Sequence, residues 1–349
     1  MITGRLRLKA IRIHEHGGPD RLLLEEIPSP PLAPDEARVR IHAAALNHLD
    51  LWVRRGIPGV RYPLPLTPGC DGAGVVLERG PVVAGFSPGD RVALAPGVSC
   101  GVCEACLGGR DNLCRDYGIL GEHRDGTCAE EIVVNGRNLI RIPDSLSFEA
   151  ASAIPLVFLT AWQMVVEKAK VRPGETVVVM GAGSGVGTAA VQIARMHSAR
   201  VIAVSGSREK LEKVRALGAD EGIDLSRSDL REEVRRLTGK RGADVVIEHV
   251  GRATFEASLL SLARGGRLVT CGATAGAEVT LSLRHLFFKN LSVLGSTMGS
   301  RASLFTLFAH VESGRLKPVV DRVMPLSEAP EAHRLLEERR IFGKIVLVP

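Results

Sequence analysis

The pattern of hydrophobic and polar residues differs between the first 150 residues and the rest of the chain. The first part contains short runs in which apolar and polar residues alternate, and Pro- and Gly-rich stretches interrupt these runs. Clear examples are residues 37–42, 74–77 and 131–134. Alternation with a period of two is typical of half-buried strands, and the Pro and Gly clusters indicate long loops. The first part therefore predicts an irregular, β-rich domain.

From residue 176 onward, continuous apolar runs alternate with stretches of helical character. The apolar runs are Thr176–Met180, Arg200–Val204, Asp244–Val250, Gly266–Cys271 and Leu291–Gly295. Strands that are apolar on both faces predict a parallel sheet covered by helices on either side. After Gly299, a helical stretch leads to strands at 321–324 and 344–348, which we expect to return to the first domain. The expected fold class is α/β.

The length of the chain agrees with two domains, because 349 residues exceed what one hydrophobic core normally supports. The expected division is a β-rich domain at 1–156, a parallel-sheet domain at 157–297 and a return to the first domain at 298–349. The net charge of +6 would suit a nucleic-acid partner, but two glutamates interrupt the densest basic stretch, 231–241. That mixture is typical of a solvated helix face, so no nucleic-acid partner is expected.

Cysteine usage and apolar runs bear on the cellular compartment. No stretch is long and apolar enough for a signal peptide or a transmembrane helix. Seven cysteines are an odd number, and four of them fall within the segment 100–114. Clustered thiols indicate metal binding in a reducing compartment rather than disulfides. We therefore expect a cytoplasmic protein without a membrane partner.

A Gly-rich turn follows the first apolar strand of the second domain. Residues 181–187 read Gly-Ala-Gly-Ser-Gly-Val-Gly and lead into a helical run, 188–197. Glycines let the main chain approach a pyrophosphate, and free N–H groups at the helix N-terminus neutralise its charge. Because the turn lies between a strand and a helix, it predicts a dinucleotide site, with a purely structural turn as the alternative. The candidate cofactor-binding residues in the turn are Gly181, Gly183, Ser184, Gly185, Val186 and Gly187.

The end of the next strand favours NADP(H) over NAD(H). An NAD site usually places an acidic residue there, about 20 residues after the turn, to bind the ribose 2′-hydroxyl. Here residues 205–210 read Ser-Gly-Ser-Arg-Glu-Lys. Hydroxyl groups and cations at this position would accept a 2′-phosphate, which a carboxylate would repel. The candidate residues are Ser205, Ser207, Arg208 and Lys210. Alternatively, the two cations are only exposed residues in the first turn of a helix.

A Gly-containing loop carries four cysteines in the pattern C-x2-C-x2-C-x7-C, namely Cys100, Cys103, Cys106 and Cys114. Four thiolates at such spacing can close a tetrahedron around Zn²⁺ and leave no open position, so they predict a structural zinc site. The alternative is an iron–sulfur cluster, but the bacterial ferredoxin pattern has three residues before its last Cys and a Pro after it. The remaining cysteines are interpreted as buried hydrophobic residues.

Together, these features resemble the zinc-containing alcohol dehydrogenase and quinone oxidoreductase group of the medium-chain dehydrogenase/reductase superfamily. The resemblance covers essentially the whole chain and rests also on the segments 47–50 (NHLD), 68–74 (PGCDGAG), 86–92 (FSPGDRV) and 343–347 (GKIVL). It implies a GroES-like catalytic domain interrupted by a Rossmann domain, in a homodimer or homotetramer. It further implies that Thr160 packs against the nicotinamide and that the strand at 291–296 extends the sheet across a dimer interface.

The resemblance also assigns the positions at which alcohol dehydrogenases of the family bind a catalytic zinc. Their first Cys falls on Asn47, their His-Glu pair on Cys70-Asp71, their second Cys on Leu156 and their relay hydroxyl on Leu49. Leu has no metal-binding group, and Asn is a poor zinc ligand. The pattern resembles the quinone and enone reductases of the superfamily, which implies hydride transfer without a catalytic metal.

Four polar residues are candidates for the chemistry. Hydride addition to an α,β-unsaturated carbonyl spreads charge into an enolate that neutral donors can hold, and the amide of Asn47 is the candidate donor. His48 and Asp50, and also His123, are candidates for supplying a proton. Each has a structural alternative: Asn47 and His48 hold their own loop, Asp50 caps the following helix, and His123 lies in a surface turn.

The expected function is the NADPH-dependent reduction of a small quinone or α,β-unsaturated carbonyl compound by an enzyme with one structural zinc. Two alternatives stay open. One is a zinc-dependent alcohol dehydrogenase in which Cys70 binds the metal with Asp71, His48 or Asp50. The other is a non-enzymatic NADPH-binding protein with an RNA-binding or structural role.

Overall fold

The computed structural model describes residues 7–349. Contacts between Cα atoms divide the chain into two compact units, of which the first comprises Met1–Leu156 and Ser300–Pro349 and the second Val157–Gly299. The last fifty residues thus complete the unit that the first 156 begin. Within the described residues, no helix is both long and apolar enough to span a bilayer.

The first unit is built on a seven-stranded sheet in the order β16-β17-β3-β4-β5-β9, with β8 also paired to β3. Its strands are β3 (Glu36–Ala45), β4 (Asp71–Arg79), β5 (Arg91–Leu94), β8 (Glu131–Asn135), β9 (Leu139–Arg141), β16 (Val320–Pro325) and β17 (Lys344–Val348). Two smaller sheets pair β1 (Arg7–Arg12) with β2 (Leu23–Pro28) and β6 (Gly97–Val98) with β7 (Gly118–Ile119). Short strands joined by long loops account for the Pro- and Gly-rich pattern of this part of the sequence.

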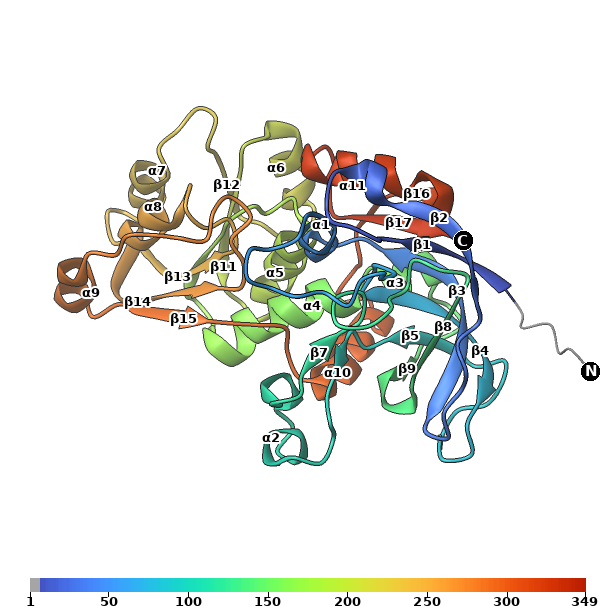
Figure 1. Ribbon diagram of the computed structural model, residues 1–349. Helices are drawn as coiled ribbons and strands as arrows, with labels where there is room; N and C mark the ends of the chain where they lie inside the picture. Colours follow the sequence, from blue (N-terminus) through green and yellow to red (C-terminus); the bar gives the residue numbers. More distant parts are fainter. Residues whose placement is uncertain (1–6) are drawn as a thin grey trace, which may run out of the picture. The chain divides into compact units, whose positions relative to one another are not determined.

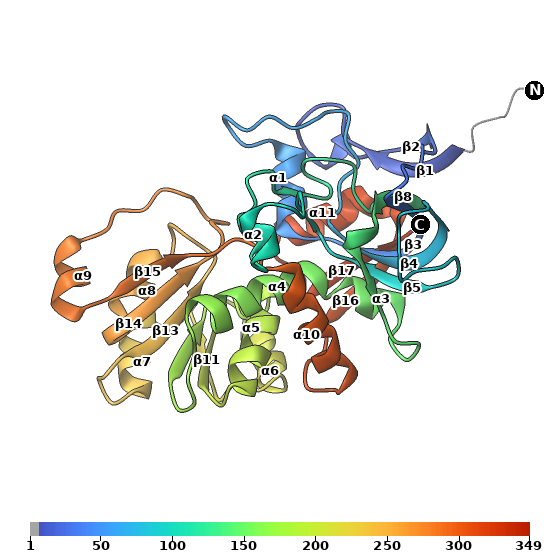
Figure 2. The same cartoon turned by 90° about the horizontal axis from the view of Figure 1, so that it is seen from below.

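The C-terminal strand determines the geometry of the candidate site. β17 pairs antiparallel with β3, so that Val346 lies opposite Ala45, and the N–H of Leu46 donates to the carbonyl of Ile345 over 2.9 Å. Strand β16 runs parallel to β17, and α11 (Ala329–Glu337) contacts both strands (Figure 2). Ile345 and Leu347 belong to the same hydrophobic core as Ile41 of β3. This pairing brings the first residue of β17 next to the end of β3.

Among its described residues, the first unit contains four further helices. They are α1 (His48–Arg55), α2 (Glu104–Leu107), α3 (Phe148–Ser152) and α10 (Arg301–Glu312), with 3-10 turns η1 (Pro19–Arg21), η2 (Asp111–Leu113), η3 (Gly136–Asn138) and η5 (Leu326–Glu328). Helix α4 (Pro155–Trp162) and the π-helical turn η4 (Gln163–Lys168) follow where the chain enters the second unit.

The second unit is a six-stranded parallel sheet in the order β12-β11-β10-β13-β14-β15. Its strands are β10 (Thr176–Val179), β11 (Arg200–Ser205), β12 (Glu221–Asp224), β13 (Ala243–Glu248), β14 (Leu262–Thr270) and β15 (Ser292–Gly295). All four residues of β10 are buried, as are five of the six in β11. This arrangement confirms the parallel, helix-covered sheet expected from the continuous apolar runs, and therefore the Rossmann-type part of the expected α/β fold.

Helices cover the two faces of this sheet in the order that right-handed crossovers require. The helices are α5 (Gly185–Met196), α6 (Arg208–Arg215), α7 (Leu230–Leu237), α8 (Phe255–Leu260) and α9 (Leu283–Lys289). Figure 1 shows α7 and α8 close together and apart from α5 and α6, in agreement with the contacts between α7 and α8. Along the chain, β11 and β12 are added on one side of β10, and β13, β14 and β15 are then added on its other side. The carboxyl ends of β10 and β13 therefore form the topological switch point, where open α/β sheets bind dinucleotides.

Candidate functional site

The four clustered cysteines converge in a small lobe of the first unit. Cys103 directly precedes α2, Cys106 lies within it, and Cys114 directly follows η2. Their Sγ atoms all lie within 4.8 Å of one another, with separations of 3.5 Å for Cys103–Cys106 and for Cys114–Cys100, and 3.9 Å for Cys100–Cys106. A tetrahedron of sulfur atoms at 2.3 Å from zinc has S–S edges of about 3.8 Å. The four thiols therefore fit one Zn²⁺ with no position left for a substrate.

Two further properties of the lobe agree with a structural metal. Main-chain N–H groups of Val102 and Cys103 lower the pKa of Cys100 to about 6, whereas burial and the thiols of Cys100 and Cys106 raise the pKa of Cys114 to about 11, so one thiolate forms readily and a cation would be needed to stabilise the others. The larger apolar side chains of the lobe, Val102, Leu107 and Leu113, are exposed, so the lobe has little apolar core of its own. A segment of this kind depends on its metal for its fold.

A second polar cluster lies at the positions that the family resemblance assigns to a catalytic zinc. The Nζ of Lys344, the first residue of β17, donates to the Oδ1 of Asn47 over 2.5 Å and to the Oδ2 of Asp71 over 3.1 Å. Asn47 Nδ2 in turn donates to Asp71 Oδ2 over 2.8 Å and lies 3.2 Å from the Sγ of Cys70. The main-chain N–H of Leu156 donates to Asp71 Oδ1 over 2.8 Å. We call these five residues the buried cluster.

The buried cluster is closed to solvent and nearly charge-balanced. Lys344 is 3% exposed, Asn47 is 4% exposed and Asp71 is fully buried. Burial together with the carboxylates of Asp50 and Asp71 raises the pKa of Cys70 well above its ordinary value, so the thiol stays protonated at neutral pH. The Lys344 ammonium supplies the single positive charge that balances Asp71.

These residues do not fit a catalytic zinc. Among the described residues, the four-cysteine lobe is the one group in which three or more His, Cys, Asp or Glu ligand atoms come together. In the buried cluster, a cation already binds Asn47 and Asp71, and a nearby Zn²⁺ would be repelled by it. Leu156 contributes only a main-chain N–H, and Leu49 packs against the apolar core. We therefore derive no step through a metal at this place.

The structure changes the interpretation of two of the catalytic candidates. The amide N–H groups of Asn47 are directed at Asp71, Cys70 and the carbonyl of Ala45, so they are used within the protein. Asp50 is fully buried, and its two carboxylate oxygens accept the N–H groups of Asn47 over 2.6 Å and of Gly69 over 3.1 Å. The geometry weighs against direct chemistry at these two residues. It agrees with their structural alternatives, a loop contact and a helix cap.

The two histidines that were candidates differ in their surroundings. His48 begins α1, is half-buried, and packs edge-on against Trp52 with 5.1 Å between ring centroids. His123 is exposed, and its Nδ1 accepts the N–H of Ile119 over 3.2 Å. His123 therefore matches its alternative as a residue of a surface turn, and His48 is the candidate proton donor with accessible surface.

The Gly-rich turn lies between β10 and α5 as the sequence predicts. Gly181 has φ of +53°, which favours glycine, and a Cβ at Gly187 would lie 2.3 Å from the Gly181 carbonyl oxygen. Ser184 is the N-cap of α5 and accepts the N–H of Gly187 over 3.0 Å. N–H groups of the first helical turn, including those of Gly185 and Val186, have no acceptor within the helix and can bind phosphate oxygens. The turn therefore fits a dinucleotide pyrophosphate.

The residues after β11 lie beside this turn. Ser205 ends the strand, Ser207 is the N-cap of α6, and the aliphatic part of Lys210 packs over the turn, so that a Cβ at Gly183 would lie 2.9 Å from its Cδ. The Arg208 side chain is 75% exposed and lies 3.3 Å from Glu212 on the same helix. The strand ends without a carboxylate at Ser205. Thr160 is buried in α4.

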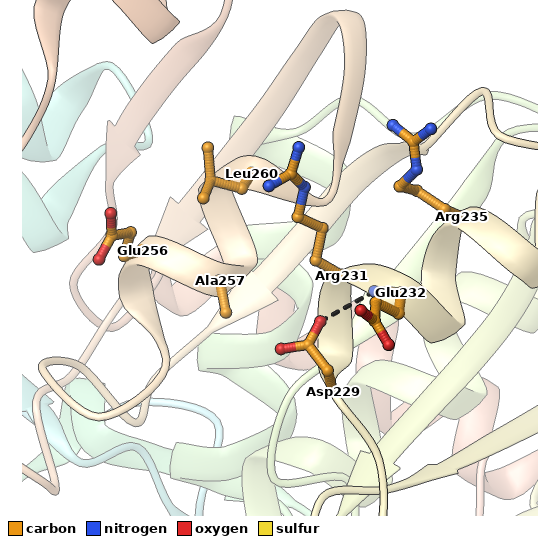
Figure 3. A pocket seen from close by; sticks show the side chains of 7 residues that line it. All are labelled: Asp229, Arg231, Glu232, Arg235, Glu256, Ala257 and Leu260. Atoms are coloured by element: carbon orange, nitrogen blue, oxygen red, sulfur yellow. Dashed lines mark hydrogen bonds between the residues drawn. The ribbon is translucent and has the colours of Figure 1, made fainter.

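A hollow on the surface of the second unit lies apart from all these residues. It is formed between α7 and α8 and is lined mainly by charged side chains (Figure 3): Asp229, Arg231, Glu232, Arg235 and Glu256, with Leu260. Asp229 accepts the N–H of Glu232 over 2.9 Å and so caps α7. These helices cover a face of the sheet, whereas the Gly-rich turn lies at the strand ends. None of the candidate site residues lines the hollow.

Comparison with known proteins agrees with this geometry. The family model described as alcohol dehydrogenase GroES-like domain matches residues 33–144, and the model described as zinc-binding dehydrogenase matches residues 185–313. Quinone oxidoreductase-like protein 2 of Bos taurus is 32% identical over 93% of this chain and 88% of its own length. The chain belongs to the medium-chain dehydrogenase/reductase superfamily. The fold and family expected from the sequence are therefore confirmed.

Solved structures of this superfamily cover nearly the whole chain. A crystal structure of an NAD-dependent alcohol dehydrogenase is 55% identical with a TM-score of 0.94, and the match covers 98% of this chain and 99% of that chain. A 2-octenoyl-CoA carboxylase reductase in complex with NADP and 2-octenoyl-CoA is 29% identical with a TM-score of 0.91, covering 98% and 87%. Medium-chain dehydrogenases of these kinds are nicotinamide-dependent oxidoreductases, and this chain is an enzyme of that class. Their substrates differ, so the family does not define the reaction.

Sequence reasoning missed Lys344 as a member of the site. Residues 343–347 were interpreted as a family segment and 344–348 as a strand, although a lone cation at the first position of an otherwise apolar strand is a signal of a buried ion pair. The partners of Lys344 lie 297 and 273 positions away along the chain. Only the pairing of β17 with β3 brings them together.

Proposed function

We propose that the enzyme reduces quinones or α,β-unsaturated carbonyl compounds with NADPH and without a catalytic metal. The observation that carries the proposal is the ammonium group of Lys344, which occupies hydrogen-bonding positions on Asn47 and Asp71 where related alcohol dehydrogenases hold zinc. The nicotinamide cofactor supplies the hydride. The remaining steps concern how this chain binds the substrate and moves a proton.

Among the described residues, the buried cluster offers no set of three or more His, Cys, Asp or Glu ligands for a Lewis acid, and this narrows the substrate class that we propose. Hydride addition to a simple ketone leaves a full negative charge on one oxygen, which a metal normally stabilises. Addition to a conjugated carbonyl or a quinone spreads that charge over oxygen and carbon atoms, so that weaker donors suffice. The buried Lys344 adds a positive potential near this place, and its 3% exposure excludes direct proton transfer to a substrate. In this proposal Asn47 is a positioning residue, and half-buried His48 supplies the proton.

The preference for NADPH rests on the residues after β11. Ser205 and Ser207 place hydroxyl groups, and the exposed guanidinium of Arg208 can turn from Glu212 towards a 2′-phosphate. Arg208→Ala should raise the KM for NADPH by about tenfold or more and change the KM for NADH less than twofold, because a charge-assisted hydrogen bond is lost only with NADPH. Glu212→Ala is the matched control, since it removes only the partner on α6. Equal effects on both cofactors would contradict the preference.

The reaction is tested by a panel of substrates measured with and without a zinc chelator. A quinone, an enone, a saturated ketone and a primary alcohol are each assayed with NADPH or NADP and with NADH or NAD. We expect kcat/KM for the quinone or the enone to exceed that for the ketone by about a hundredfold or more, which corresponds to about 2.7 kcal/mol. Brief chelation that leaves the four-cysteine lobe loaded should not change these rates.

A zinc-dependent alcohol dehydrogenase is the second candidate, and the 55% identity to a structure described as an NAD-dependent alcohol dehydrogenase favours it. Rapid alcohol oxidation with NAD that stops on chelation while the fold persists would support this candidate and reject the first. If no electrophile oxidises NADPH and the protein binds RNA tightly, both enzymatic candidates fail.

We also propose that the enzyme forms homodimers or homotetramers in a reducing compartment such as the cytoplasm, where thiolate ligands persist. Strand β15 is an edge of its sheet. Leu283, Phe287 and Phe288 of the neighbouring α9 are all more than half exposed, which is unusual for a lone surface helix. Pairing of β15 with a second copy would cover both features. Phe288→Glu should shift the mass measured by analytical ultracentrifugation towards the monomer, whereas Phe305→Glu, at another exposed position, should not.

A further inference from the structure

A buried histidine faces the Gly-rich turn from the other side of the switch point. His249 directly follows β13, whose neighbour in the sheet is β10, and it is 8% exposed. A Cβ placed on Gly181 would lie 2.8 Å from its Cε1 and 3.3 Å from its Nε2. The Cε1–Nε2 edge of the imidazole therefore points at the first glycine of the turn, and Gly181 must lack a side chain to make room for it.

One nitrogen of this imidazole has no hydrogen-bond partner among the described residues. The buried Nε2 lacks a partner, and main-chain groups of Met180 and of His249 itself lie close enough to the ring to raise its pKa in part. Burial holds the pKa of His249 below its ordinary value of 6.5, so the ring is neutral at pH 7. A neutral imidazole carries its proton on one nitrogen, and in the tautomer with the proton on Nδ1 the Nε2 atom is an acceptor that an O–H donor can satisfy. A buried acceptor without a donor is costly, so an external group is expected to fill this position.

The topology indicates which part of a dinucleotide reaches His249. The pyrophosphate lies at the N-terminus of α5, and the adenosine ribose lies at the end of β11, next to Ser205. β11 and β13 lie on opposite sides of β10. The other half of the cofactor must therefore extend over the end of β13. Its ribose carries hydroxyl groups, which can donate to Nε2, whereas a phosphate diester oxygen has no proton to donate.

We propose that His249 is a cofactor-binding residue whose Nε2 accepts a hydrogen bond from a hydroxyl of the nicotinamide-side ribose. The contact rests on the nicotinamide cofactor of the superfamily and does not depend on the NADPH preference or on the reaction proposed above. It holds the half of the cofactor that carries the hydride, and it uses a residue outside the Gly-rich turn.

The test compares ADP-ribose, which contains the second ribose, with ADP, which ends at the pyrophosphate. Affinities are measured by isothermal titration calorimetry, with the 2′-phosphorylated forms of both ligands where these bind more tightly. His249→Phe keeps the ring volume and removes the acceptor, so it should weaken ADP-ribose about five- to tenfold and leave ADP within twofold. His249→Gln places an amide oxygen near the same position and should stay within about threefold of the unaltered protein for both ligands.

His197→Phe is the matched control. His197 also has an Nε2 without a partner among the described residues, but it lies at the opposite end of α5 from the Gly-rich turn. This variant should leave both affinities unchanged. Binding of ADP by His249→Phe shows that the variant is folded. If His249→Phe does not fold, His249→Ala replaces it. A smaller gain in affinity from ADP to ADP-ribose in His249→Ala than in the unaltered protein would then support the proposal, and an unchanged gain would overturn it. An unchanged affinity for ADP-ribose in the folded variant, or an equal loss for both ligands, would overturn the proposal.

Discussion

The four-cysteine lobe and the buried cluster are two polar sites of the same unit with opposite constructions. The lobe takes all its ligands from one fifteen-residue segment at the surface, and its Sγ atoms lie 3.5–3.9 Å apart in the pairs measured. The buried cluster takes its members from residues 47, 70–71, 156 and 344, and a lysine ammonium stands at its centre. A local metal site is visible in the spacing of its ligands. A site closed by a charged side chain becomes visible only when distant strands pair.

The difference also has an energetic basis. The lobe exposes its larger apolar side chains and offers four thiols that could hold an external cation, whereas the cluster is buried and contains its own cation. Removing a metal ligand from the lobe and removing the lysine from the cluster should therefore both be costly. Only the first change should alter the metal content.

The largest effect is expected from Cys103→Ser. Loss of one thiolate from the lobe should lower the zinc content from one per chain to near zero and destabilise the first unit by about 4 kcal/mol or more, as loss of a structural metal commonly does. Metal analysis and urea unfolding measure the two effects. Cys70→Ser is the matched control, because it alters the family ligand position without touching the lobe. It should keep one zinc per chain, and a loss of zinc in this variant would contradict the comparison.

Lys344→Met should be next in size. It leaves the Asp71 carboxylate buried without its cation, and breaking a buried ion pair in this way costs about 3–5 kcal/mol. The zinc content should stay at one. The double variant Lys344→Met/Asp71→Asn should lose less than the sum of the two single variants, because neither charge is then left alone. Lys213→Met, at an exposed pair with Glu209, should cost less than about 0.5 kcal/mol. Additive losses in the double variant would show that the ammonium does not act on Asp71.

Asp50→Asn gives a smaller and pH-dependent effect. Burial raises the pKa of Asp50 from 3.8 to about 6, so the folded state binds this proton more tightly than the unfolded state. The contribution of Asp50 to the free energy of unfolding is therefore greatest below about pH 4 and falls as the pH rises through 6, by about 3 kcal/mol in all. The difference in free energy of unfolding between the unaltered protein and the variant, measured by urea unfolding, should decrease by about 3 kcal/mol from pH 4 to pH 7.

Asp90→Asn controls for a general effect of removing a carboxylate. A side-chain hydrogen bond from Arg141 lowers the pKa of the half-buried Asp90, so its small contribution should be retained at neutral pH and lost only as the pH falls. A constant difference between the unaltered protein and Asp50→Asn over the same range would contradict the burial of an ionisable Asp50.

The sequence predicted much of the fold because apolar periodicity is a local property. The runs at Thr176–Met180 and Arg200–Val204 became β10 and β11. Strand β12 was missed because its sequence, Glu-Gly-Ile-Asp, lies at the edge of the sheet and has one buried residue, so burial imposes no apolar run on it.

The candidate sites also divide into those that a local stretch of sequence reveals and those that depend on contacts between distant segments. The cysteine spacing and the Gly-rich turn are contiguous, and their residues could be named from sequence. The family positions Asn47 and Leu156 could be named as well, but their surroundings depend on Lys344, which reaches them through strand pairing. Asn47 was expected to donate to a substrate because nothing in its local sequence shows that Asp71 and Cys70 take up its amide. His249 was missed because no sequence motif links it to Gly181. The two residues lie close together only because β13 pairs with β10 in the sheet.

The most direct test of the central claim is the zinc content per chain of the unaltered protein, measured by inductively coupled plasma mass spectrometry after dialysis against a zinc-buffered solution. We expect one zinc, held by the four-cysteine lobe. Two zincs per chain, falling to one in Cys70→Ser, would contradict the account, because the buried cluster would then bind a metal in place of relying on Lys344.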